Sequence, residues 1–180
     1  MLIEKDNIKC ETTFSEDKSH RLLWKRVWNK EKPCLAIIMI NPCLSDNIVT
    51  DTTTSLCLNN VARMEEYGGI HILNLFTLCT NKLCFRYNSD EDLIHKDNDS
   101  YIVKSAQECS KVILAWGRTE STNQRVGDRA AKVVELLSAY ADKLYCISDG
   151  QRKGLHPLTP SIRANWSLER FELVPKDEAK

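Results

Sequence analysis

The sequence lacks the features of several protein classes. It has no excess charge of either sign, with 25 Lys and Arg against 25 Asp and Glu. This balance excludes a uniformly basic nucleic-acid binder but allows a local basic face. The longest apolar run, residues 34–40, is far too short to cross a bilayer, and the first residues contain no apolar stretch of signal-peptide length. We therefore expect a soluble cytoplasmic protein that has no membrane partner.

The eight cysteines form no C-x-x-C pair, and the nearest spacing is Cys79-x4-Cys84. A structural zinc site usually shows closely spaced pairs of ligands, so this spacing argues against zinc. Disulfides are rare in the cytoplasm. We expect most of these thiols to be small buried apolar side chains.

Four short apolar runs are rich in β-branched residues, and three are nearly continuous, as in strands buried on both faces. They cover residues 35–40, 69–75, 111–116 and 144–147. Segments with helical spacing lie between them, at residues 56–67, 101–109 and 129–143, and Asn98-Asp99-Ser100 offers an N-cap for the second. This alternation predicts a three-layer α/β/α fold with a four-stranded parallel central sheet. We expect one domain over residues 1–180, with a core at about 33–166.

Such sheets bind ligands in the crevice outside the carboxyl ends of their strands. Polar or Gly/Pro segments follow the predicted strands at that edge. They are Asn41-Pro42-Cys43, Asn74-Leu75-Phe76, Trp116-Gly117-Arg118 and the segment from Ser148 to Pro157. This pattern predicts an active site there. Structural roles also fit, because Asn41-Pro42 matches a helix N-cap followed by a proline in the first turn.

Taken in chain order, these segments resemble the motifs of the uracil-DNA glycosylase superfamily. That family has a water-positioning Asp-Pro-Tyr or Asn-Pro-Gly motif, a base-reading Asn at a strand end, a Leu-Trp-Gly segment and a final His-Pro-Ser loop. The matching segments here are Asn41-Pro42-Cys43, Leu73-Asn74, Ala115-Trp116-Gly117 and His156-Pro157-Leu158. The resemblance covers about residues 35–161, and the same motifs also resemble an uncharacterised domain family of bacteria and phages.

The resemblance implies an enzyme, a monofunctional DNA glycosylase that uses no metal or organic cofactor and leaves an abasic site. Asn41 would position the attacking water, and His156 would donate a hydrogen bond to the base oxygen as charge develops there. Asn74 would read the edge of a flipped-out pyrimidine, with Phe76 stacked on its base and Pro42 beside it. No Lys lies in the four motifs, so a Schiff-base lyase step is not expected.

Two departures from the family pattern bear on the substrate. Cys43 stands where the uracil-specific branch has a Tyr that packs against C5 of the base and excludes thymine. The small Cys43 leaves room at C5 and favours a C5-modified base, such as hydroxymethylated or glucosylated cytosine of phage DNA, or a range that includes uracil and mismatched thymine. Leu158 stands where the family has Ser, and either Leu158 or Ile162 would be the wedge that fills the vacated stack.

DNA is the expected partner, and no obligate protein partner is implied. The last loop carries Arg152, Lys153, Ser161 and Arg163, which would meet DNA phosphates and make affinity depend on salt. The segment 20–28 mixes basic residues with two tryptophans. It would either stack on nucleic acid or form a helix that packs its tryptophans on the sheet, and the helix is the favoured interpretation.

Several alternatives remain open at the level of sequence. An amide cannot take a proton from water, so Asp46 and Asp51, which follow Asn41 closely, are alternative catalytic bases. The same fold would also suit a hydrolase of free modified nucleosides or nucleotides, or a non-catalytic reader of modified DNA. A flavodoxin-like module for a phosphorylated ligand is disfavoured, because no glycine-rich phosphate loop follows any of the strands. Base-excision repair and antiphage defence both fit this chemistry.

Overall fold

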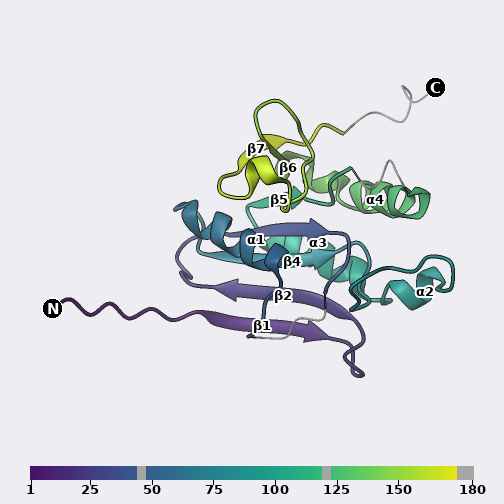
Figure 1. The fold of residues 1–180 in the computed structure, drawn as a ribbon, viewed down its shortest axis with the longest axis horizontal. Coiled ribbons are helices and arrows are strands. Elements are labelled where there is room, and N and C mark those ends of the chain that lie inside the picture. Colours follow the sequence, from purple (N-terminus) through teal and green to yellow (C-terminus); the bar gives the residue numbers. More distant parts are fainter. Residues whose placement is uncertain (44–47, 119–122, 174–180) are drawn as a thin grey trace.

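The computed structural model describes residues 1–43, 48–118 and 123–173. Across this part of the chain, seven strands form one sheet in the order β1-β2-β4-β3-β5-β6-β7 (Figure 1). The strands are β1 (Lys9–Phe14), β2 (Arg21–Val27), β3 (Cys34–Met39), β4 (Gly69–Asn74), β5 (Lys111–Leu114), β6 (Leu144–Ser148) and β7 (Ser167–Arg170). The α-helices are α1 (Thr52–Arg63), α2 (Asp90–Leu93), α3 (Asn98–Glu108) and α4 (Gln124–Leu136), with 3-10 turns at Ser138–Lys143 and Pro160–Ile162.

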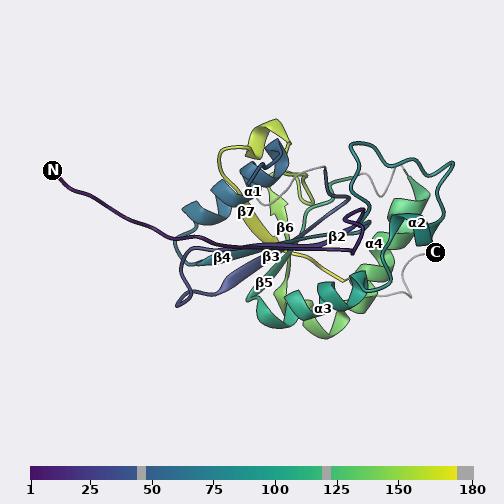
Figure 2. The same cartoon turned by 90° about the horizontal axis from the view of Figure 1, so that it is seen from below.

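The four predicted apolar runs form the middle of the sheet as β3, β4, β5 and β6. β3 pairs in parallel with both β4 and β5, and β5 pairs in parallel with β6. Helix α1 covers one face, and α3 and α4 cover the other (Figure 2). Every residue of β4 is buried between these layers, including the polar side chains of His71 and Asn74. The predicted α/β fold is confirmed.

The predicted four-stranded sheet is incomplete, because β1, β2 and β7 extend it with antiparallel pairs. The prediction of a helix over residues 20–28 is wrong, because this segment contains β2, which pairs with β1 and β4. Leu23 and Trp24 are buried in the clusters on opposite faces of the sheet, as neighbouring residues of a strand are. The edge of β4 supplies backbone hydrogen bonds to β2 that local sequence spacing does not reveal.

The predicted helices are present with shifted ends. α1 begins after Asp51, whose Oδ1 accepts a hydrogen bond from the backbone N–H of Thr54 at 3.0 Å. α3 begins at Asn98, but its side chain caps no helix and instead donates to the carbonyl oxygen of Asn74 at 3.0 Å. The predicted helix over 129–143 starts earlier as α4 and ends in a 3-10 turn.

The cysteines are all free thiols. Cys57, Cys109 and Cys146 are buried, three are half-buried, and Cys10 and Cys84 are exposed, so the prediction that most are buried is wrong. Among the residues the structure describes, no helix is long and apolar enough to span a membrane. In the same residues no group of three or more His, Cys, Asp or Glu side chains is arranged to hold a metal ion.

His71 predicts a pH dependence of stability. Its ring lies in β4 under α3, with Nδ1 3.2 Å from Oγ of Ser105, and burial, together with nearby Lys25, lowers its pKa to about 4. In the unfolded chain this histidine has an ordinary pKa near ~6.5, so between the two pKa values it binds a proton in the unfolded chain and not in the folded chain. We expect the free energy of unfolding to rise between pH ~4 and ~6.5, by up to about 3 kcal/mol from this group.

Urea unfolding at several pH values measures this effect. The variant His71→Gln keeps a polar partner for Ser105 but does not titrate, so its stability should rise less over the same interval. Burial also lowers the pKa values of His20 and His156, and a residual slope of the same sign should therefore persist. Equal slopes in the variant and the wild type would contradict the assignment to His71.

Candidate functional site

A cavity of about 150 Å³ lies beyond the carboxyl ends of the parallel strands. It brings together three predicted residues, Asn41, Cys43 and His156, together with the alternative base Asp51. The other lining residues are Arg21, Met39, Ile40, Thr53 and Thr54. Asp46, the other alternative base, lies outside the described residues. The prediction of an active-site crevice at this edge therefore coincides with a cavity whose wall carries several of the predicted side chains.

The amide of Asn41 is held by backbone carbonyls across the cavity rim. Its Nδ2 donates to the carbonyl oxygen of Thr80 at 2.8 Å and to that of Pro42 at 3.2 Å. The backbone N–H of Thr80 donates in turn to the Pro42 carbonyl at 3.2 Å, which ties the two segments together. Both amide protons of Asn41 are thereby engaged, and Oδ1 is the atom that can accept a hydrogen bond from water in the cavity.

His156 presents a neutral imidazole to the same cavity. Its Nδ1 accepts a hydrogen bond from the backbone N–H of Leu158 at 3.2 Å, which places the proton of the neutral ring on Nε2. Burial of the ring lowers its pKa below the ordinary histidine value. The side chain is therefore a fixed neutral N–H donor at physiological pH.

Asp51 and Cys43 complete the polar wall. The Asp51 carboxylate accepts from the backbone N–H and from the hydroxyl of Thr54, at 3.0 and 2.7 Å, so it caps α1 while facing the cavity. Burial, together with the nearby carboxylate of Asp51, raises the pKa of the Cys43 thiol. Cys43 is consequently a small neutral side chain and not a thiolate nucleophile.

Gly117 permits the close approach of the His156 loop to the end of β5. It has a positive φ of +71°, and a Cβ added there would lie 3.0 Å from Cβ of His156. Only glycine adopts this backbone conformation without strain while leaving that space open. The packing of the His156 loop against Gly117 thus explains why a glycine follows Trp116 in the Ala-Trp-Gly segment.

Gly117→Ala should displace His156 as well as strain the backbone. We expect a loss of about 1–2 kcal/mol of stability from the left-handed conformation alone. Gly150→Ala is the matched control, because Gly150 also has a positive φ, of +84°, but a Cβ there meets nothing within 4 Å. Both variants should lose stability in urea unfolding, and only Gly117→Ala should change the NMR titration of the His156 ring. Unchanged His156 titration in Gly117→Ala would contradict the packing role.

Asn74 lies behind the cavity wall and not in it. Its side chain is 1% exposed, and neither Oδ1 nor Nδ2 has a hydrogen-bond partner among the described residues. Its register partner on β3 is Met39, which lines the cavity. A buried amide without partners carries an energetic cost, which is explained if a ligand or water supplies the missing hydrogen bonds.

Phe76 and Pro42 are both buried away from solvent. Phe76 is fully buried, belongs to the cluster that packs on α3 and α4, and meets Phe85 edge-on at 5.3 Å between ring centroids. The structure therefore does not bring Phe76 to the cavity, and the expected stacking of Phe76 on a base is not supported by this geometry. Pro42 adjoins the cavity through its neighbours Asn41 and Cys43.

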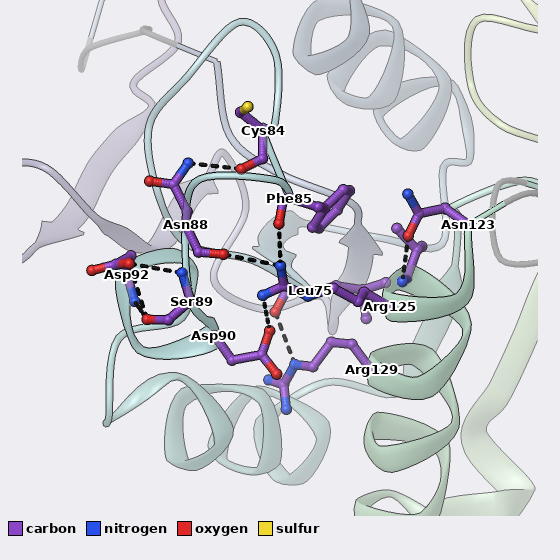
Figure 3. Close-up of polar contacts among 11 residues, drawn as sticks. Leu75, Cys84, Phe85, Asn88, Ser89, Asp90, Asp92, Asn123, Arg125 and Arg129 are labelled. Atoms are coloured by element: carbon purple, nitrogen blue, oxygen red, sulfur yellow. Dashed lines mark hydrogen bonds and ion pairs between the residues drawn. The ribbon is translucent and has the colours of Figure 1, made fainter.

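Two arginines of α4 hold the chain that follows β4 (Figure 3). Arg129 is buried, its Nε donates to the Leu75 carbonyl at 2.9 Å, and it forms an ion pair with Asp99. Arg125 donates to the carbonyl oxygens of Phe85 and Asn88 at 2.7 and 2.9 Å. A charged cleft of about 350 Å³ adjoins these side chains, but its arginines are already used in such contacts. This anchoring role depends on contacts with segments far away in the sequence, and residue spacing did not predict it.

The predicted DNA-contacting side chains are mostly engaged with the protein itself. Arg152 forms an ion pair with Asp149 at 2.7 Å, and Ser161 also donates to Asp149. Lys153 forms an ion pair with Glu169 at 3.0 Å. The remaining basic side chain of this set, Arg163, is exposed and donates through Nε to the Leu158 carbonyl.

The two candidate wedge residues differ in exposure. Ile162 is 1% exposed and belongs to the core cluster beneath α1, so the structure rules it out as a wedge. Leu158 is 37% exposed, two residues beyond His156 in the same loop. Of the two residues, Leu158 is the one whose exposure is compatible with a wedge.

Comparison with known proteins gives one match. The model of a family described as a protein of unknown function, DUF1643, matches residues 21–158. No curated protein and no solved structure matches the chain. The matched range begins at the first residue of β2 and ends in the His156 loop, and it therefore includes every described residue that lines the cavity.

Proposed function

We propose that this chain, which belongs to the DUF1643 family, is a monofunctional DNA glycosylase that hydrolyses the N-glycosidic bond of a non-standard pyrimidine and leaves an abasic site. The observation that carries the proposal is the convergence of Asn41, Cys43 and His156 on one cavity at the carboxyl edge of the parallel strands. The strand order β4-β3-β5-β6, with one motif after each strand, supports a uracil-DNA-glycosylase-like arrangement of this core.

The volume of the cavity favours a single six-membered ring. An apolar protein cavity of ~150 Å³ accommodates one benzene molecule. The cavity here has a similar volume, about 150 Å³, which suits a pyrimidine better than a two-ring purine. A base reaches such a cavity only after it has been flipped out of the duplex.

The polar groups match the needs of glycosidic hydrolysis. Oδ1 of Asn41 orients a water, and the Nε2–H of His156 donates to the base oxygen on which negative charge develops. Asn74 lies behind the wall, so this geometry does not bring its amide to the pyrimidine edge, although that amide has no hydrogen-bond partner among the described residues. Because an amide is a poor proton acceptor, much of the barrier must be lowered by stabilising the leaving base.

Cys43 bears on the choice of base. Its small side chain in the cavity wall leaves room where a larger residue would press against C5. This favours a C5-modified pyrimidine, such as hydroxymethylated cytosine, over uracil alone, and the sugar of glucosylated cytosine would have to lie outside a cavity of this volume. A role in defence against phages with modified DNA, or in base-excision repair, follows from that substrate class.

A second function, hydrolysis of free modified nucleosides or nucleotides, is favoured by one observation. Arg152 and Lys153 are paired with Asp149 and Glu169, which leaves fewer basic groups in this loop for a phosphate backbone. A DNA substrate should bind with an affinity that falls steeply with salt, whereas a free nucleoside should bind with little salt dependence.

The test is incubation with a panel of DNAs followed by alkali, which cleaves at abasic sites. The panel contains uracil, mismatched thymine, 5-hydroxymethylcytosine and its glucosylated form, and the corresponding free nucleosides are run in parallel. Cleavage of one DNA supports the glycosylase and identifies its base. Release of base from nucleosides alone supports the second function. Tight binding of a modified DNA without cleavage overturns both in favour of a reader.

A further inference from the structure

Arg21 is a buried cation in the wall of the cavity. Its side chain is only 2% exposed, and it lines the cavity together with Asn41 and His156. Among the described lining residues it is the one that carries a permanent positive charge, because the pKa of His156 is lowered. Asp51 is the acidic residue in the same wall.

An irregularity in strand pairing aims Arg21 at the cavity. Thr13 pairs with Leu23 and Phe14 pairs with Arg21, so the register of β1 and β2 shifts at this point. Leu23 faces the α3 and α4 side, and regular alternation would point Arg21 to the same side. The shift turns Arg21 toward the cavity lined by α1 instead. Such bulges are frequent beside active sites, where they re-aim a side chain.

The Arg21 guanidinium keeps its charge inside the protein. Burial lowers the pKa of Arg21, against the opposing influence of Cys79, Asp51 and Cys43, but a guanidinium remains protonated in proteins. Arg21 has contacts within the protein, and its place in the cavity wall also puts a positive charge beside Asn41 and His156.

We propose that Arg21 is a further catalytic residue, which stabilises the negative charge of the departing base. This inference rests on the proposed function. In the reaction the bond between C1′ and N1 breaks, and its electron pair stays on N1 of the base. The oxygen of water bonds to C1′, the proton lost by that water passes to solvent, and the base anion takes up a proton from solvent after release.

The neutral groups of the cavity explain why a cation is needed. Asn41 orients water but cannot accept its proton, and neutral His156 offers a hydrogen bond without a full charge. A buried guanidinium supplies the full charge in a region of low dielectric, where its effect on an anion is large. The leaving base, and not the attacking water, is therefore the centre of catalysis in this cavity.

The first test is the binding of free bases, measured by calorimetry on the full chain. 5-Nitrouracil is an anion at neutral pH and uracil is neutral. We expect the wild type to bind the anion at least about tenfold tighter, as one full charge contact in a buried site allows. Arg21→Gln should lose this preference, and Arg21→Lys should retain part of it.

Arg26→Met is the matched control. Arg26 lies on the same strand and is 3% exposed, but its guanidinium lies over the Trp24 ring at 3.9 Å and donates to the Glu11 carbonyl, away from the cavity. This variant should keep the preference for the anion. If the wild type shows no preference, or if folded Arg21→Gln keeps it, the role of Arg21 is overturned without recourse to turnover.

The second test is turnover of uracil and 5-fluorouracil in DNA, since fluorine makes N1 a better leaving group. Arg21→Gln should lower kcat by about 100- to 1000-fold with little change in KM. The decrease in kcat should be smaller for 5-fluorouracil than for uracil. If the wild type cleaves no DNA but shows the Arg21-dependent preference for the anion, the proposed glycosylase activity is refuted and the binding role of Arg21 is not. A wild type that cleaves DNA, with an equally active Arg21→Gln, refutes the Arg21 role alone.

Discussion

Asn41→Ala should lower the rate of abasic-site formation by about 100-fold or more, with little change in the affinity for DNA. The amide is fixed by the Thr80 and Pro42 carbonyls, so its Oδ1 has one orientation from which to hold water. A displacement of the nucleophile by about 1 Å lowers the reaction rate on the order of 100-fold. Single-turnover cleavage of the panel substrate, together with a filter-binding isotherm, separates the two effects.

Asn41→Asp tests the same geometry in the opposite direction. One carboxylate oxygen would face the Thr80 carbonyl at the position where Nδ2 now donates at 2.8 Å, so two acceptors would repel each other. We expect Asn41→Asp to be less active than the wild type, although a carboxylate is the better proton acceptor. A variant faster than the wild type would show that the cavity tolerates a base at this position and that the Thr80 contact is dispensable.

The sequence predicted the parallel centre of the sheet because its physical cause is local. Strands buried on both faces are apolar at nearly every position, and β3 and β5 have that composition. The antiparallel strand β2 gives no such signal. It carries Arg21, Lys25 and Arg26, and its existence depends on the edge of β4, far away in the sequence. Trp24 and Trp28 suggested a helix face, whereas backbone pairing decides the outcome.

The same distinction separates the predicted from the missed parts of the site. Asn41, Cys43 and His156 lie directly after strands, and the carboxyl ends of parallel strands meet at one edge, so their convergence follows from topology. Arg21 enters the cavity through a shift in pairing between β1 and β2, which no spacing of residues reveals. Ile162 was a candidate wedge because only exposure distinguishes it from Leu158, and exposure depends on packing beneath α1.

His156→Ala should lower kcat by about 100- to 1000-fold, comparable to the removal of one donor from an oxyanion site. In the proposed reaction the Nε2–H of the neutral ring is the donor available to the departing base, because Nδ1 already accepts from the Leu158 N–H. His156→Gln, whose amide nitrogen reaches a similar position, should recover part of the rate. Full activity in His156→Ala would contradict the role of this ring.

The pH profile of the wild type tests the protonation state of His156. Its pKa is lowered by burial, so the ring stays neutral as the pH falls through ~6.5, where an ordinary histidine would become charged. Protonation would place a second donor against the Leu158 N–H and break the contact that orients the ring. We therefore expect kcat to remain level from pH ~8 to below ~6.5 and to fall only at more acidic pH. A decline centred near ~6.5 would mean that the ring titrates as if exposed, and the leaving base would then lack a donor of fixed orientation.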